Sequence, residues 1–390
     1  MKTDDVLIIG GGPAGSSCAK ELAKRGIGVT VIEKDSFCGE KNVCGGVLNA
    51  AAVEKYDLQY ATEGKLSKAR MYCENNFIEV PQERYTFRRS YFDRKLSEAA
   101  IEEGANVLHD QLMIDFSVKA DGVKIKIKNA TTGEEKFIDG SLIVGADGFA
   151  SKVRSKLNGN SRMDWLACVQ YQIPYTAVED IDTDVAYFIF NEIYKSGYGW
   201  IFPKKEGLTV GIGSPCPIDF DIKKELDNLA LPLMKKNANH KKFYESSLIP
   251  AKIADKLVGN RALLIGDAAG LVKPIGGGGI EYAIESGIEA AKTIEKALLE
   301  RKSLNENTLS RYLQNIDHIA KKIEKEGKLL EFLEREGFAK LFNNLMAKKK
   351  FQTLSLLFTG NKNCLLGTFK ESPLLVLKYL RHGLGAAGHD

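Results

Sequence analysis

The sequence predicts an α/β fold in which a parallel sheet with flanking helices is interrupted by an antiparallel sheet and followed by a helical C-terminal region. Three observations support this prediction. A short apolar strand runs into a glycine-rich turn and a helix within residues 5–25. Strand-like segments then follow one another without intervening helices from Trp165 to Ile212, and charged, helix-like sequence extends from Leu309 to Leu345. Strand–turn–helix units build parallel sheets, whereas runs of strands build antiparallel ones.

The composition is that of an ordinary globular protein. The 390 residues suffice for two or three domains, or for one large domain with an insertion. The net charge of +4 is too small to argue for nucleic acid binding. No apolar run approaches the roughly 18–20 residues that span a bilayer, and we expect no signal peptide. The seven cysteines lack a repeated C-x-x-C spacing, so we expect neither a disulfide framework nor a metal site, and a reducing cytoplasm is the default.

The glycines of the first turn have the spacing G-x-G-x-x-G, which Gly10, Gly12 and Gly15 satisfy. The first glycine permits a tight turn, the second lets a pyrophosphate approach the backbone, and the third lets helix and strand pack closely. The diphosphate then lies at the helix N-terminus, where free N–H groups and the helix dipole favour an anion. We expect Pro13 and Ala14 to contact it too. The pattern predicts a Rossmann-type dinucleotide site.

A second strand, from Gly28 to Ile32, ends in Glu33. This carboxylate lies at the expected distance to accept hydrogen bonds from an adenosine ribose, and it would repel a 2′-phosphate. Lys34 follows directly and is placed in the same contact. The site should therefore hold FAD or NAD rather than NADP.

A polar loop after Glu33 ends in Cys44, Gly45 and Gly46. Paired glycines indicate a close backbone approach or a positive φ. Cys44 itself has two interpretations, a small residue packed in a turn or a functional thiol.

Two later loops resemble the first in kind. An apolar strand from Leu142 runs into Asp147 and Gly148, which form either a second contact with the dinucleotide or an ordinary Asp-Gly turn. A strand beginning at Arg261 ends in Gly266 and Asp267. Four glycines at 276–279 then open a helix, an arrangement that suits an anion or a carbonyl. Two such helix starts in one sheet suggest a long ligand touched at both ends.

Three aromatic residues alternate along one predicted strand of the β-rich segment: Tyr198, Trp200 and Phe202. Alternate residues of a strand point to the same face. That face is either part of a core or a wall that faces a ligand.

The order of these motifs resembles the FAD-dependent oxidoreductases of the aromatic-hydroxylase fold over roughly residues 1–300. In that family the first motif holds the ADP moiety, and the Asp-Gly motif helps to shape the dinucleotide site. The resemblance implies that Asp267, in the Gly-Asp motif, contacts the ribityl chain. The last helix, with Gly278, Gly279 and Ile280, would point at the flavin ring. Arg89, followed by Phe92-Asp93, matches the family's cofactor-contacting arginine.

Two further pieces are similar to the geranylgeranyl reductase branch: the Cys44-Gly45-Gly46 loop beside the flavin, and Tyr198-x-Trp200-x-Phe202-Pro203 as a substrate wall. Flavin halogenases carry Trp-x-Trp-x-Ile-Pro instead. The resemblance implies a reductase that saturates double bonds of a polyprenyl lipid with a hydride from flavin N5. A free thiol has a pKa of about 8.5 and is protonated at neutral pH, so Cys44 is the candidate for gating or proton delivery.

Two other functions stay open. An FAD-dependent monooxygenase of the aromatic-hydroxylase type shares every FAD motif, and a flavin-binding protein without turnover is a minor alternative. The chain has no second G-x-G-x-x-G, so we expect the electron donor, NAD(P)H or ferredoxin, to dock transiently.

We expect a discontinuous FAD-binding domain (1–50, 88–160 and 258–300), a substrate-binding β-sheet domain (51–87 and 161–257) and a helical region (301–390). From Lys340 to Arg381 eight Lys and Arg accompany one acid and many Leu and Phe. This tail is either a membrane-surface contact or a solvated helical cap. The protein is accordingly expected in the cytoplasm, either free or peripheral at the inner face of the membrane.

Overall fold

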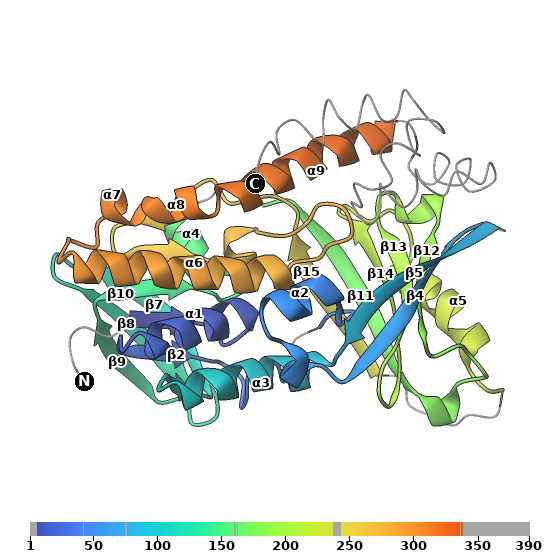
Figure 1. Cartoon of the computed structure of the whole chain (residues 1–390), viewed down its shortest axis with the longest axis horizontal. Coiled ribbons are helices and arrows are strands. Elements are labelled where there is room, and N and C mark those ends of the chain that lie inside the picture. The colour runs from blue at the N-terminus through green and yellow to red at the C-terminus, as the bar shows by residue number, and fades with distance from the viewer. Residues whose placement is uncertain are drawn as a thin grey trace.

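The computed structural model describes residues 6–335 and 337, apart from 42, 75, 160, 162 and 237–242. Within these residues the chain forms three sheets that are joined and covered by helices (Figure 1). The side chains of residues 333 and 335 are not described.

The first sheet has the strand order β16-β17-β10-β1-β2-β6. Its strands are β1 (Val6–Ile9), β2 (Val29–Ile32), β6 (Asn106–Leu108), β10 (Leu142–Gly145), β16 (Val258–Gly259) and β17 (Ala262–Leu264). All pairs are parallel except β16 with β17. The apolar strands β1, β2 and β10 are wholly buried, as expected of a parallel sheet covered on both faces. The predicted parallel sheet is confirmed, and the loops after β1 and β10 leave it at the same edge.

Two long helices, α1 (Pro13–Lys24) and α6 (Ile280–Leu299), lie side by side along this sheet (Figure 1). They approach closely because residue 287 is a glycine. A Cβ at Gly287 would lie 2.4 Å from the carbonyl oxygen of Ala14. This close packing places α6, which begins at Ile280, beside α1, the helix that follows the first glycine turn.

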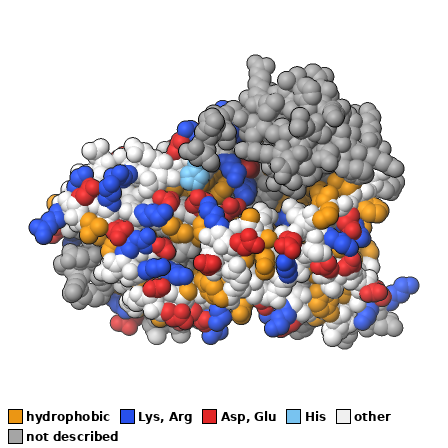
Figure 2. Space-filling model, in the orientation of Figure 1, with side chains coloured by type: hydrophobic (Ala, Val, Ile, Leu, Met, Phe, Trp, Pro, Cys, Tyr) orange, Lys and Arg blue, Asp and Glu red, His pale blue; other side chains and the backbone are white. Residues whose placement is uncertain are grey.

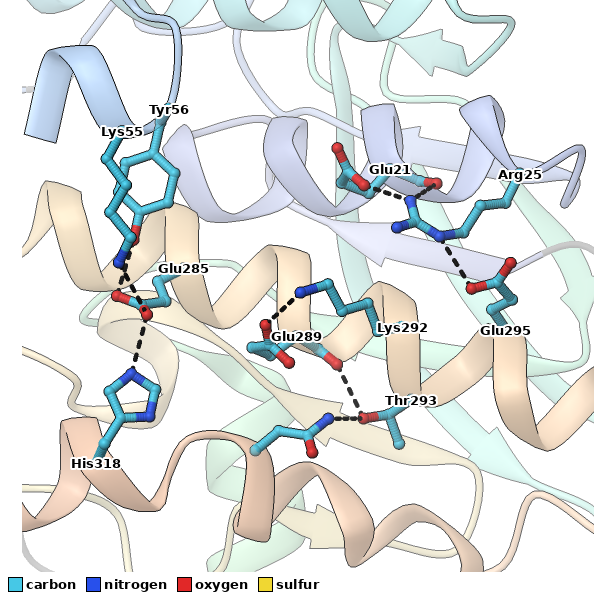
Figure 3. A network of polar contacts seen from close by, with 11 residues as sticks. Glu21, Arg25, Lys55, Tyr56, Glu285, Glu289, Lys292, Thr293, Glu295 and His318 are labelled. Atoms are coloured by element: carbon cyan, nitrogen blue, oxygen red, sulfur yellow. Dashed lines mark hydrogen bonds and ion pairs between the residues drawn. The ribbon is translucent and has the colours of Figure 1, made fainter. Parts of the chain in front are cut away.

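A polar network connects α6 to four other helices (Figure 3). Arg25, the C-cap of α1, pairs with Glu295 at 2.9 Å. Glu285 accepts a hydrogen bond from the hydroxyl of Tyr56, the C-cap residue of α2 (Ala50–Lys55). Its carboxylate also contacts the His318 ring of α9 (Asp317–Arg335). Partly exposed pairs of this kind stabilise the fold by about 1 kcal/mol or less each. The position of α6 therefore depends mainly on its packing, and the polar network adds a smaller contribution.

The third sheet is the meander β7 (Gln111–Val118), β8 (Val123–Asn129) and β9 (Glu135–Gly140). Its apolar face joins the core of the first sheet. α3 (Arg89–Glu102) packs against α1, and α4 (Lys152–Asn158) follows β10.

The second sheet has the order β15-β11-β14-β13-β12-β4-β5-β3. Its strands are β3 (Val47–Asn49), β4 (Gly64–Cys73), β5 (Asn76–Thr86), β11 (Trp165–Pro174), β12 (Val185–Phe190), β13 (Tyr198–Pro203), β14 (Gly207–Pro215) and β15 (Phe243–Pro250). The expected antiparallel pattern holds for every pair but one, because β12 runs parallel to β4. The sheet is mixed because two chain segments on either side of α3 meet at this pair. Val47–Asn49, expected in the FAD-binding segment 1–50, pairs with β5 instead.

Short helices complete the fold. They are α5 (Ile222–Ala230), α7 (Glu306–Leu309), α8 (Arg311–Asn315), η1 (Gln59–Ala61), η2 (Tyr175–Ala177), η3 (Glu192–Tyr194), η4 (Leu231–Leu233) and η5 (Gly266–Ala269). The expected helical region after residue 300 is therefore present as three successive helices up to Arg335. The basic tail from Lys340 lies outside the described residues, so its membrane role stays a prediction.

Lys and Arg side chains alternate with Asp and Glu over the described surface that Figure 2 shows. No single sign of charge dominates this face. In the described part of the chain, none of the helices combines the length and the hydropathy that a bilayer span requires.

Candidate cofactor and substrate site

The first glycine turn forms an open cradle at the start of α1. Gly12 is the N-cap and has no side-chain cap, which leaves the first N–H groups of α1 available to an anion. Gly10 has φ +99°, and a Cβ there would lie 2.4 Å from the carbonyl oxygen of Ala146. A Cβ at Gly15 would lie 1.9 Å from the carbonyl oxygen of Gly10. A Cβ at Gly12 would approach only a guanidinium nitrogen of Arg89, at 3.8 Å, so this side of the turn is open.

Glu33 lies directly after β2 and its carboxylate faces the same turn. It accepts hydrogen bonds from the backbone N–H of Gly11 at 2.7 Å and of Asp35 at 3.0 Å. Burial raises the pKa of Glu33, although both bonds oppose the shift. Each carboxylate oxygen has a second lone pair, which leaves capacity for the hydroxyls of a ribose. Lys34 beside it is exposed.

Arg89, the first residue of α3, lies over the glycine turn. Its guanidinium binds both carboxylate oxygens of Asp93, each at 2.7 Å, and the Asp93 side chain is fully buried. Burial opposes the charge on the guanidinium, but the ion pair outweighs it and raises the pKa of Arg89. The structure thus holds a permanent cation at the mouth of the turn.

The Asp147 side chain has a local task. It accepts a hydrogen bond from Ser151 at 2.5 Å and others from the backbone N–H of Lys152 and Val153, so it caps α4. Gly148 has φ +71°, and a Cβ there would meet nothing within 4 Å. The loop therefore adopts a fixed shape with an open side.

Asp267 lies in η5 beside the glycine quartet that precedes α6. A Cβ at Gly279, the N-cap of α6, would lie 3.1 Å from an oxygen of this carboxylate. Burial raises the pKa of Asp267, while Arg89 and Arg154 oppose the shift. No donor to this carboxylate is found among the described residues. Arg154, which the sequence analysis did not single out, donates to the carbonyl oxygens of Asp267 and Ala268 at 3.4 and 3.3 Å.

Tyr198, Trp200 and Phe202 share one face of β13, as predicted. The ring of Trp200 lies 5.9 Å from that of Tyr198 and 6.3 Å from that of Phe202. Phe188 of β12 extends the row, 5.2 Å from Phe202 and 5.7 Å from Tyr198. We call these four rings the aromatic wall. Trp200 lies flat on Gly211, where a Cβ would come within 2.2 Å of the indole.

The aromatic wall contacts both glycine loops. The Tyr198 hydroxyl donates to the carbonyl oxygen of Gly276 at 2.9 Å, in the loop before α6. A Cβ at Gly45 would lie 2.9 Å from the Phe202 ring and 3.5 Å from the Trp200 indole nitrogen. That nitrogen is buried and has no acceptor among the described residues.

The Cys44-Gly45-Gly46 loop is fixed by its own backbone and by a lysine. The N–H of Gly46, at φ +63°, points at the Cys44 sulfur at 3.3 Å. The buried Lys204 ammonium donates to the carbonyl oxygens of Gly45 and Gly46. Burial lowers the pKa of Lys204 to about 7. The sequence did not indicate a role for Lys204, because its only distinguishing feature there is its position directly after Phe202-Pro203.

The family model for an FAD binding domain matches residues 3–326 of the chain. A digeranylgeranylglycerophospholipid reductase from Methanosphaera stadtmanae is 30% identical, over 83% of this chain and 85% of its own. A second reductase of that name, from Thermoplasma acidophilum, is 30% identical over 91% of this chain and 89% of its own. The chain belongs to the geranylgeranyl reductase family of FAD-dependent oxidoreductases. Its cofactor is FAD, and it is an enzyme.

Solved structures agree with this family. A geranylgeranyl bacteriochlorophyll reductase-like protein from Thermoplasma acidophilum is 26% identical and superposes with a TM-score of 0.80, covering 97% of this chain and 98% of its own. A flavin-dependent brominase is 20% identical, with a TM-score of 0.70 and coverage of 92% and 93%. At that identity the brominase shares the fold alone.

The described residues of this geranylgeranyl reductase family member fit FAD. The open sides of Gly12 and Gly148 leave room beside the N-terminus of α1. The carboxylates of Glu33 and Asp267 have acceptor capacity for the ribose and ribityl hydroxyls of FAD. The start of α6 lies beside the second of these carboxylates. A long dinucleotide needs such contacts at both ends.

Proposed function

We propose that the protein reduces double bonds of a polyprenyl, geranylgeranyl-type lipid in an FAD-dependent reaction. The observation that carries the proposal is the aromatic wall, which touches the Cys44-Gly45-Gly46 loop at Phe202 and the α6 glycine loop at Tyr198. The names of the relatives, which are reductases of a digeranylgeranylglycerophospholipid, support it.

In this proposal the ADP end of FAD is held by residues of the first turn and of β2, and the flavin end by the later loops and Arg89. The residues are Gly10, Gly12, Pro13, Ala14, Gly15, Glu33, Lys34, Cys44, Gly45, Gly46, Arg89, Asp147, Gly148, Gly266, Asp267, Gly278, Gly279 and Ile280. FAD held by these residues would, once reduced, supply a hydride to one carbon of the double bond. The other carbon requires a proton.

Cys44 is the proposed proton donor, because its loop lies on the aromatic wall and a neutral thiol can donate. Tyr198, Trp200 and Phe202 would hold the chain of the substrate and exclude water from it. An unactivated alkene offers little charge to a catalyst, so positioning supplies much of the rate.

One experiment tests this function. The purified, FAD-loaded protein is reduced anaerobically with NAD(P)H or reduced ferredoxin and mixed with a geranylgeranyl lipid, and the product is weighed by mass spectrometry. We expect a mass gain of two hydrogens for each reduced bond. Hydroxylation coupled to oxygen consumption would instead support the monooxygenase, whose relatives of known structure share only the fold. A flavin that no donor reduces would indicate a protein without turnover.

The variant Lys204→Met tests the support of the Cys44-Gly45-Gly46 loop. Methionine has no donor, so the carbonyl oxygens of Gly45 and Gly46 lose their hydrogen-bond partner and the loop shifts on the aromatic wall. We expect about tenfold slower lipid reduction with FAD content unchanged, measured as kcat and by absorbance. Lys205→Met changes the exposed neighbour and should have no effect. Equal rates for both variants would contradict the supporting role.

The electron donor, the membrane surface and the location in the cell stay predictions. Salt-sensitive co-sedimentation with anionic liposomes would support a surface contact of the basic tail. Absent or salt-insensitive binding would count against it.

A further inference from the structure

A guanidinium group borders the aromatic wall at its β12 side. Arg84 lies on β5, and its guanidinium carbon is 5.3 Å from the ring centroid of Phe188. Phe188 in turn packs against Phe202 and Tyr198. Arg84 is half-buried, so its side chain lies beside the apolar rings and is still partly accessible to solvent. A cation therefore lies beside the face on which we place the lipid chain.

This cation has no anionic partner within the described part of the chain. Its Nε and one Nη donate to the neutral side-chain oxygen of Gln82, at 3.1 and 2.8 Å. The acids on the neighbouring strands and loops are engaged by other cations. These pairs are Glu79 with Arg70 and Lys68, Glu83 with Lys65, and Glu63 and Glu206 with Arg88. Burial accordingly lowers the pKa of Arg84.

The uncompensated charge indicates the chemistry of a ligand. A guanidinium has five N–H donors, and Gln82 takes two of them, so three remain. They lie in a planar fork whose geometry matches the oxygens of a phosphate group. A charge that is partly desolvated and lacks a counter-charge is unfavourable until an anion arrives. Gln82 fixes the plane of the fork in the meantime.

We propose that Arg84, oriented by Gln82, binds the phosphate group of the substrate while the apolar chain lies along the aromatic wall. The substrate class is then an amphiphile in which a phosphate adjoins a polyprenyl chain. This proposal rests on the proposed function and makes it more specific. The phosphate belongs either to the phosphodiester of a glycerolipid or to a free prenyl phosphate, and both present the same oxygens to Arg84.

The first test compares substrates that share one chain and differ in charge. Wild type, Arg84→Gln and Arg84→Lys are assayed with a geranylgeranyl glycerophospholipid, geranylgeranyl phosphate and geranylgeraniol. We expect Arg84→Gln to lower kcat/KM by about tenfold or more for the phosphate-bearing substrates, through KM, and to leave the alcohol unchanged. Arg84→Lys should recover part of the loss. Arg70→Gln, on the same sheet and paired with Glu79, is the matched control.

The substrate that shows the larger loss identifies the source of the phosphate. Equal losses for the alcohol and the phosphates, or no loss for any, would overturn the proposal. FAD content and the circular dichroism spectrum confirm that each variant is folded. If Arg84→Gln does not fold, Arg84→Lys with its milder loss carries the comparison.

The second test needs no turnover. Trp200 belongs to the aromatic wall, so tryptophan fluorescence can follow binding of geranylgeranyl phosphate and geranylgeraniol to the protein with and without FAD. We expect tighter binding of the phosphate by wild type, weakened by salt, and equal binding of the two ligands by Arg84→Gln. Equal binding by wild type would overturn the inference. Selective binding without any lipid reduction would leave the inference standing and remove the proposed function.

Discussion

Replacing Arg89 with methionine is expected to lower the free energy of unfolding by about 3–5 kcal/mol and to yield protein that retains no FAD. The loss of stability follows because the Asp93 side chain is fully buried and would lose the cation that binds both of its oxygens. The loss of FAD follows because this guanidinium lies over the open side of Gly12. Chemical denaturation measures the first effect, and absorbance near the flavin bands measures the second.

A double variant separates the two effects. Arg89→Met with Asp93→Asn removes both charges, and replacing both members of a buried pair is much less costly than removing one. We expect the double variant to regain most of the stability and still to lack FAD. If it bound FAD like wild type, Arg89 would have only a structural role, and the cofactor contact proposed for it would be wrong.

The variant Cys44→Ser is expected to slow lipid reduction by about 100-fold or more, the lower end of what a positioned proton donor contributes. Serine keeps the size of the side chain, but its hydroxyl is a far weaker acid than a thiol. FAD binding should stay unchanged because serine preserves the backbone of the loop, and reduction of the flavin by its donor does not require the proton.

Single-turnover mixing of pre-reduced enzyme with lipid isolates this step from flavin reduction. Cys216→Ser, which alters another half-buried thiol just beyond β14, is the control. Wild-type rates for Cys44→Ser would mean that Cys44 fills space in its turn, which is the other interpretation of its sequence.

Local stereochemistry explains which parts of the site could be predicted. The conformations of Gly10 and Gly15 follow from contacts within one strand–turn–helix unit, so their spacing is sufficient evidence. The common face of Tyr198, Trp200 and Phe202 follows from the period of a strand. Such features need only neighbours along the chain.

Contacts between segments that are far apart in the chain could not be predicted from the sequence. Lys204 acts on carbonyl oxygens about 160 residues away in sequence, and backbone carbonyls leave no trace in residue identity. Asp147 could be recognised as a loop residue, but its capping of α4 depends on where that helix begins. The parallel pairing of β4 with β12 was missed because the two strands are far apart in the sequence and the residues of neither strand indicate the direction of its partner.

That parallel pair also determines how the chain can be divided. Because β4 is hydrogen-bonded to β12 from Lys68 to Cys73, strands that precede α3 and strands that follow α4 belong to one sheet. A fragment containing only residues 161–257 would lack β4 and would expose the edge of β12 that β4 covers. The unpaired N–H and C=O groups of such an edge promote aggregation. Transfer of this second sheet to another flavoprotein therefore requires moving both segments together.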